Sequence, residues 1–169
     1  PDALRGALAA SVPAAIALNS RTPDAQIASD LDAALAYLRS DPRVDNRRIA
    51  TMGFCFGGRE SMRLGIRQTG LAAVVTLYGS GLVTDPAALG NLADNGPVLG
   101  IFGEEDRSIP LREVEEFELA LTGVGAEATI TVYPDVGHAF VKSSTFGGSG
   151  AAGQAWNQLV QFLTDSIGN

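Results

Sequence analysis

The single cysteine of the chain, Cys55, lies in the glycine-rich segment Gly53–Gly58, which reads GFCFGG. This is the nucleophile-elbow pattern G-x-S-x-G with cysteine in place of serine. Gly53 and Gly57 are expected to leave room for a sharp turn from a strand into a helix, which holds the central residue in a strained conformation and points its side chain outward. The helix N-terminus would stabilise a thiolate, and the backbone N–H of Phe56 would receive a developing oxyanion. The pattern therefore indicates nucleophilic catalysis, and the alternative is a buried structural cysteine in a glycine-rich turn.

The single histidine, His138, is the second candidate for chemistry. It is the only side chain whose ordinary pKa suits proton transfer near neutral pH. It lies in the segment Tyr133–Phe140, which reads YPDVGHAF and follows a predicted strand. Loops at the carboxyl ends of parallel strands are where catalytic groups gather in open α/β sheets. We therefore expect His138 to be the general base, and a structural histidine is the alternative.

A third partner of this constellation should be a carboxylate at the end of another strand. The segment Gly103-Glu104-Glu105-Asp106 follows a predicted strand and offers three. Asp106 is favoured because a short carboxylate fixes an imidazole tautomer with less conformational freedom. Glu104 and Glu105 are interpreted as parts of a solvated loop.

A fold must bring these residues together. The hydrophobic pattern predicts alternating strands and helices, which is typical of a parallel α/β architecture. Apolar, β-favouring runs predict four strands: Arg48–Phe54, Leu71–Tyr78, Pro97–Phe102 and Ala128–Tyr133. Helical spacing predicts four helices: about Pro23–Ser40, one from near Gly57, one from Pro110, and about Ala152–Ile167. The first two strands are expected to be buried on both faces, and the Ser- and Gly-rich segment Ser143–Gly153 is expected to be a flexible loop. The pattern predicts one domain over residues 1–169: a three-layer α/β/α sandwich around a mostly parallel sheet of at least four strands.

Three motifs together, GFCFGG, GEEDRSIP and YPDVGHAF, resemble the dienelactone hydrolase family of α/β-hydrolases. The order Cys55, Asp106, His138 agrees with the Ser, Asp/Glu, His order of α/β-hydrolases and differs from that of chymotrypsin or subtilisin. The resemblance runs from the first predicted helix to the last, which contains Trp156. It implies that Cys55 is the nucleophile, His138 the base and Asp106 its orienter.

The same resemblance implies hydrolysis of a small ester or lactone through an acyl-thioester, without a metal or cofactor. In lactone-cleaving members a basic residue shortly after the histidine helps to hold the substrate carboxylate. Lys142 is the nearest candidate for that role, and a solvated lysine is the preferred alternative.

The chain departs from the family pattern in residues 1–20, where nothing resembles the strands that precede the first helix in the family. We therefore expect an N-terminally truncated, α/β-hydrolase-like fold that represents the C-terminal part of the family fold. In the family pattern, the second backbone N–H of the oxyanion hole lies before the first helix, and so does an acidic residue that tunes the reactivity of the cysteine. Loss of one oxyanion donor lowers the rate on the order of 10²- to 10³-fold.

This departure has a structural consequence as well. The strand before Cys55 would have an exposed edge, so we expect a second copy or an upstream segment to cover it. The alternative function is a catalytically weak or silent fragment that acts as a self-associating or partner-binding domain.

Composition excludes several other classes of protein. The net charge is −7, with 19 acidic and 12 basic residues, so binding to nucleic acid or to an anionic membrane surface is not expected. One cysteine and one histidine form neither an internal disulfide nor a usual Cys/His zinc site, which favours a reducing, cytoplasmic location. The most apolar stretch, Gly6–Leu18, is too short to span a bilayer and contains Pro13. It could be part of a signal peptide, but the first residue is Pro1 rather than Met, so an incomplete or processed N-terminus is preferred.

Overall fold

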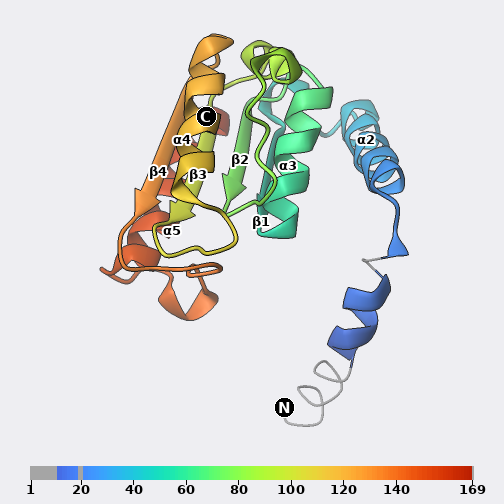
Figure 1. Cartoon of the computed structure of the whole chain (residues 1–169). Helices are drawn as coiled ribbons and strands as arrows, with labels where there is room; N and C mark the ends of the chain where they lie inside the picture. The colour runs from blue at the N-terminus through green and yellow to red at the C-terminus, as the bar shows by residue number, and fades with distance from the viewer. Residues whose placement is uncertain (1–10, 19–20, 169) are drawn as a thin grey trace. The chain divides into compact units, whose positions relative to one another are not determined.

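The computed structural model describes residues 11–18 and 21–168 (Figure 1). Residues 11–18 are helical, and residues 1–10, 19 and 20, which belong to the segment predicted to lack the family's first strands, lie outside the described residues. Two compact units divide the chain between Tyr37 and Leu38, within helix α2 (Asp24–Ser40). The prediction of one domain over residues 1–169 stays a prediction. None of the helices in the described ranges combines the length and the apolar character that crossing a membrane requires.

The second unit contains a four-stranded parallel sheet in which the strand order follows the chain order, β1-β2-β3-β4. The strands are β1 (Ala50–Phe54), β2 (Ala73–Leu77), β3 (Val98–Gly103) and β4 (Ala128–Tyr133). All four carboxyl ends therefore meet at one edge of the sheet, which is the lower edge in Figure 1. The loops that carry Cys55, Asp106 and His138 leave β1, β3 and β4 at that edge.

Helices cover both faces of this sheet, as the α/β/α prediction requires. They are α3 (Phe56–Arg67), α4 (Leu111–Gly123) and α5 (Ala151–Ile167), with α3 and α4 in front of the sheet in Figure 1 and α5 behind it. Successive side chains of β2 point to opposite faces of the sheet, which explains why helices pack on both faces. Val74 lies against α3 at Gly65, whereas Val75 belongs to the core cluster that includes Leu159 of α5.

Burial of apolar side chains between these layers holds the second unit together. Eleven buried residues of this unit form a hydrophobic core cluster, and the largest include Tyr78, Phe102 and Ile101. Fully burying one side chain of this size contributes about 1.5–3 kcal/mol. The core therefore fixes the strand ends, and with them the loops that carry the candidate site.

Two details of the strand and loop predictions are wrong. First, β1 is not buried on both faces: Met52 and Phe54 are 40% and 37% exposed. Among the described residues β1 is an edge strand, and α5 packs on β2 and β3. Second, the segment predicted as a flexible loop contains the 3-10 helix η4 (Ser143–Thr145) and the first turn of α5. Gly153 is buried in that turn.

The ends of β1, β2 and β3 also differ from the predicted ends by one or two residues, and two of these shifts have a local reason. Residues 46–48 form a 3-10 helix because the side chain of Asp45 accepts a hydrogen bond from the backbone N–H of Arg47, so β1 starts at Ala50 instead of Arg48. Tyr78 leaves β2 with a φ of 40°.

Candidate active site

Cys55 lies on a tight turn between β1 and α3, where the sequence predicts a nucleophile elbow. Its φ is 54° and its ψ is −119°, a conformation that few non-glycine residues adopt and that costs on the order of 1–3 kcal/mol. Its backbone N–H donates to the carbonyl oxygen of Leu77 (2.9 Å), which ties the turn to the end of β2. The Cys55 side chain is exposed, so the alternative of a buried structural cysteine is excluded by the geometry.

The glycines of the turn have unequal roles. A Cβ atom on Gly53 would collide with the backbone carbonyl group of Gly57, and a Cβ on Gly58 would approach the carbonyl oxygen of Leu77 to 2.9 Å. A Cβ on Gly57 would meet nothing within 4 Å. The expectation that Gly57 is needed for space is therefore wrong, because the close approach of α3 to the sheet falls at Gly53 and Gly58.

Phe56 is the first residue of α3, so its N–H has no intrahelical acceptor. The first helical bond begins three residues later, where the N–H of Arg59 donates to the carbonyl oxygen of Cys55 (3.1 Å). The N–H of Phe56 therefore remains available beside the thiol, at the positive end of the helix dipole.

The loops after β3 and β4 are bound to each other through their backbones. The N–H of Glu104 donates to the carbonyl oxygen of Tyr133, and the N–H of Glu105 donates to that of Val136, both at 2.9 Å. Gly103 permits this approach, since a Cβ there would collide with the carbonyl oxygen of Val136. As a result, Asp106 on the first loop faces His138 on the second.

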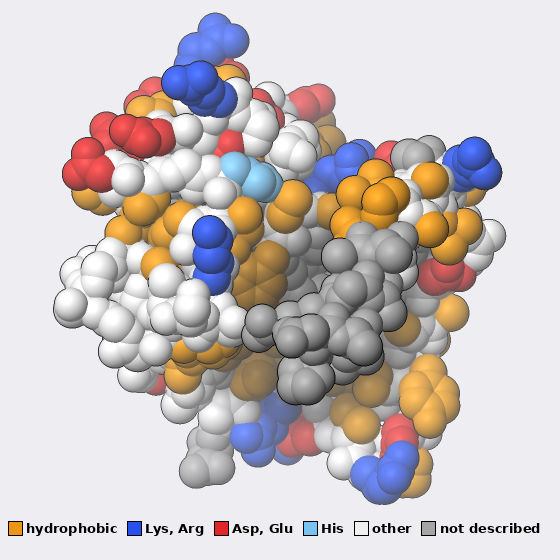
Figure 2. Space-filling model, turned by 90° about the horizontal axis from the view of Figure 1, so that it is seen from below, with side chains coloured by type: hydrophobic (Ala, Val, Ile, Leu, Met, Phe, Trp, Pro, Cys, Tyr) orange, Lys and Arg blue, Asp and Glu red, His pale blue; other side chains and the backbone are white. Residues whose placement is uncertain are grey.

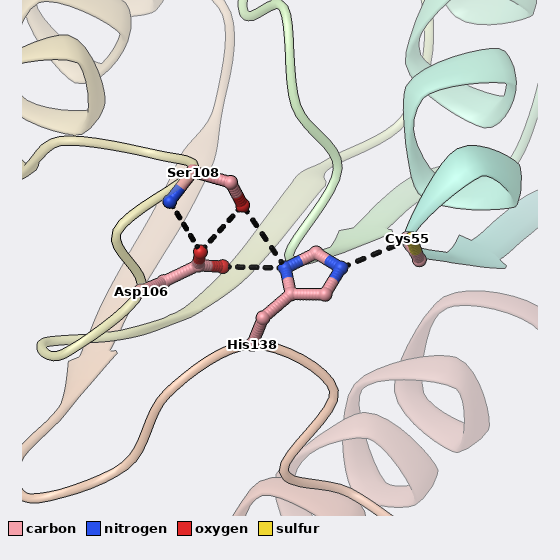
Figure 3. A network of polar contacts seen from close by, with 4 residues as sticks. All are labelled: Cys55, Asp106, Ser108 and His138. Atoms are coloured by element: carbon pink, nitrogen blue, oxygen red, sulfur yellow. Dashed lines mark hydrogen bonds and ion pairs between the residues drawn. The ribbon is translucent and has the colours of Figure 1, made fainter.

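The three residues form a continuous chain of contacts (Figure 3). His138 Nε2 lies 3.0 Å from Cys55 Sγ, and His138 Nδ1 lies 2.6 Å from Asp106 Oδ2. Because an ionised carboxylate only accepts hydrogen bonds, the proton is assigned to Nδ1, which leaves Nε2 to exchange a proton with Sγ. The Asp106 side chain is 1% exposed and that of His138 is 34% exposed, so the chain of contacts runs from the interior to the surface.

Electrostatics favour a charged imidazole at this position. Partial burial lowers the pKa of His138, but hydrogen bonds to Cys55 and Asp106 and their charges outweigh burial, so the pKa is raised above its ordinary value of 6.5. Burial raises the pKa of Asp106, but hydrogen bonds from Ser108 and His138 outweigh it, and the pKa is lowered. Asp106 is therefore an anion that stabilises the imidazolium of His138.

Two further residues contact the three and were not predicted. Ser108 donates to Asp106 through its backbone N–H and its hydroxyl group. The rings of Tyr78 and His138 lie edge-on to each other, with centroids 5.4 Å apart. Burial, together with the Cys55 charge, raises the pKa of Tyr78 to about 12. The spacing Asp-x-Ser is a known signal for a side-chain bond to the backbone two residues on. No comparable pattern distinguishes Tyr78 from a core tyrosine.

The remaining candidates lie at the surface. Glu104 and Glu105 are exposed, in agreement with their interpretation as solvated residues. Lys142 is exposed and directly precedes η4, and its backbone N–H donates to Oγ1 of Thr145, the last residue of η4. Figure 2 shows the histidine at the surface with hydrophobic side chains beside it. Within residues 11–18 and 21–168, no group of three or more His, Cys, Asp or Glu side chains is arranged to hold a metal ion.

Known proteins resemble this chain in sequence and in fold. The sequence model of the "Dienelactone hydrolase family" matches residues 7–167. A Methylorubrum extorquens protein named "Putative carboxymethylenebutenolidase" is 38% identical over 128 residues, which cover 72% of this chain and 44% of that protein. A protein of the same name from Escherichia coli is 36% identical over 129 residues, 73% of this chain and 47% of that protein.

Among solved structures, a crystal structure titled as a putative dienelactone hydrolase from Klebsiella pneumoniae superposes with a TM-score of 0.69 at 31% identity. That match covers 86% of this chain and 63% of the other. The chain spans about half the length of the curated relatives that it matches. The match over residues 7–167 shows that the chain belongs to the dienelactone hydrolase family.

Proposed function

We propose that the protein hydrolyses a small ester or lactone with Cys55 as nucleophile, His138 as general acid and base, and Asp106 as the residue that orients the imidazole. The observation that carries the proposal is the unbroken pair of contacts, 3.0 Å from Sγ to Nε2 and 2.6 Å from Nδ1 to Oδ2. The family match and the relatives named carboxymethylenebutenolidase support an ester or lactone as the substrate class.

The reaction has two steps. In acylation, the Cys55 thiolate forms a bond to the substrate carbonyl carbon, and the resulting oxyanion accepts a hydrogen bond from the N–H of Phe56. The His138 imidazolium then donates its Nε2 proton to the leaving oxygen as the C–O bond breaks, which leaves an acyl-thioester on Sγ. In deacylation, neutral His138 takes a proton from water, the hydroxide attacks the thioester, and the carboxylic acid leaves as the thiolate re-forms.

Selective alkylation tests this mechanism, because Cys55 is the only cysteine. The chain is treated with iodoacetamide until mass spectrometry shows one adduct on Cys55, and turnover of an activated aryl ester is then measured. The expected result is loss of turnover in proportion to alkylation. A Cys55→Ala variant treated in the same way controls for reaction at other side chains. Unchanged turnover with Cys55 fully alkylated would exclude the mechanism.

A second candidate function, self-association with weak or no catalysis, is favoured by the edge of β1. Within residues 38–168, β1 pairs with β2 on one side and with no strand on the other, and Met52 and Phe54 are exposed beside that edge. An unpaired edge strand with apolar side chains favours pairing with another chain. Light scattering that shows a dimer, together with no acyl adduct after brief exposure to a reactive ester, would support this function. Formation of the acyl adduct would count against it.

A further inference from the structure

The carboxylate of Asp106 divides its two oxygens between two partners (Figure 3). Oδ2 faces His138 Nδ1 at 2.6 Å. Oδ1 accepts both hydrogen bonds that Ser108 can donate, from the backbone N–H at 2.9 Å and from the hydroxyl group at 2.6 Å. Because the Asp106 side chain is 1% exposed, these bonds replace the water that would otherwise solvate Oδ1.

The Ser108 hydroxyl group also lies 3.4 Å from His138 Nδ1. A hydroxyl group has one proton, and the short bond to Asp106 Oδ1 uses it. Toward His138 the Ser108 oxygen can therefore only accept, which is compatible with a proton on Nδ1 and not with a lone pair there. The contact thus favours the same tautomer that Asp106 Oδ2 selects, with Nε2 facing Cys55.

We propose that Ser108 is a positioning residue of the Cys55–His138–Asp106 constellation: its hydroxyl group prevents rotation of the Asp106 carboxylate and thereby keeps Nε2 of His138 directed at Sγ. The inference deepens the proposed function and rests on it. Among the described residues, Ser108 bonds to Asp106 and lies near His138 Nδ1 but does not contact Sγ, so it acts through Asp106.

The backbone around Ser108 makes this role possible. The N–H of Ile109 donates to the carbonyl oxygen of Asp106 (3.1 Å), and the Ile109 side chain is 2% exposed in the core. Ser108 lies between these two anchored residues, so its hydroxyl group is fixed although the residue is exposed. Substitution at an exposed position should leave the fold intact, which makes the role testable.

Ser108→Ala removes the hydroxyl bond and keeps the backbone N–H bond. Oδ1 then has one donor, the carboxylate can rotate, and fewer molecules hold Nε2 toward Sγ. The titratable groups that contact the imidazole are Cys55, Asp106 and Tyr78. Ser108→Ala leaves the contacts of Cys55 and Tyr78 with the imidazole in place. It alters the Asp106 contact and removes the 3.4 Å contact of the Ser108 oxygen with Nδ1, so a change in Cys55 reactivity reports on these two.

The experiment measures the rate of Cys55 alkylation by iodoacetamide from pH 5.5 to 9. We expect Ser108→Ala to lower the rate at pH 6.5 by roughly three- to tenfold, the effect of weakening one hydrogen bond to a charged group, with little change at pH 9. Ser108→Thr should restore the wild-type rate, whereas Ser108→Val, which has the shape of threonine and no hydroxyl group, should not. A profile for Ser108→Ala and Ser108→Val identical to that of the wild type would overturn the proposal.

Ser166→Ala is the matched control, since it removes a hydroxyl bond to the carbonyl oxygen of Phe162 (2.8 Å) on α5. It should leave alkylation unchanged, and an equal fall in this control would mean that the effect of Ser108→Ala is not specific. Acylation by an aryl ester is measured in parallel and should show a lower acylation rate with an unchanged KM in Ser108→Ala. Alkylation does not require hydrolysis, so wild-type protein that forms no acyl adduct would refute the proposed function, while the alkylation profiles would still decide the role of Ser108.

Discussion

The turn at Cys55 predicts opposite outcomes for two glycines four residues apart. A methyl group added at Gly53 would collide with the backbone of Gly57, and neither backbone can yield without moving the start of α3 away from β1. A methyl group added at Gly57 would meet nothing within 4 Å. Gly53→Ala and Gly57→Ala are therefore a matched pair of substitutions in the same turn.

The magnitudes follow from the packing. Gly53→Ala should lower the free energy of unfolding by about 1–3 kcal/mol, the usual range for overpacking a close contact. A displacement of α3 by about 1 Å would also move the N–H of Phe56 relative to Sγ and lower activity by on the order of 10²-fold. Gly57→Ala should be neutral or stabilising by up to about 1 kcal/mol, because alanine favours a helix more than glycine does.

Urea denaturation followed by circular dichroism measures the free energy of unfolding, and the rate of Cys55 alkylation measures the geometry of the turn. The two variants must differ in the predicted order in both assays. Equal damage by the two substitutions, or a Gly53→Ala variant as stable and reactive as the wild type, would refute the reasoning.

Other perturbations test the rest of the site. Asp106→Asn should lower kcat by on the order of 10²- to 10⁴-fold, because an amide can present its NH2 group to Nδ1 and reverse the tautomer; steady-state rates within threefold of the wild type would contradict this. The pKa of His138 is raised and acylation uses the imidazolium, so the acylation rate should fall only when the pH rises through a value above 6.5. Stopped-flow measurement of acylation against pH checks this. A fall centred below pH 6.5 would be inconsistent with the contacts of His138 with Cys55 and Asp106. If Lys142 holds a substrate carboxylate, Lys142→Ala should raise KM severalfold for an ester that carries a carboxylate and leave KM for a neutral ester unchanged, as steady-state kinetics with the two esters would show. Glu60 is 4% exposed and pairs with Arg59 (2.8 Å) and Arg63 (3.3 Å), so Glu60→Ala should lower the free energy of unfolding by about 2 kcal/mol, and an unchanged urea midpoint would refute that role.

The sequence predicted the fold class and most elements because each apolar run has the length and period of one element. Strand β4 occupies Ala128–Tyr133, as predicted, and α5 differs from the prediction by one residue at its start. The burial of β1 could not be predicted in this way. An apolar run shows which side chains prefer to be buried, but it does not show how many neighbours the strand has, and β1 has one neighbouring strand among the described residues.

The three residues of the candidate site could be predicted because each is rare or follows a strand in a pattern that chemistry requires. Cys55 and His138 are single occurrences in the chain. Asp106 was separated from Glu104 and Glu105 by side-chain length, and the structure buries Asp106 while the other two are exposed. Ser108 was missed although the Asp-x-Ser spacing signals its bonds to Asp106, because its contact with His138 depends on the distance between two loops. The roles of Gly57 and Gly58 also depend on how closely α3 approaches the sheet.

The most direct test of the central claim is to locate the acyl group after a brief reaction with an activated ester. The chain is quenched in acid within seconds, digested, and mapped by mass spectrometry, with Cys55→Ala as the control. We expect one acyl group per chain, attached to Cys55 and lost on longer incubation in the presence of His138. Ester hydrolysis at the same rate by Cys55→Ala, or an acyl group found on another residue alone, would contradict it.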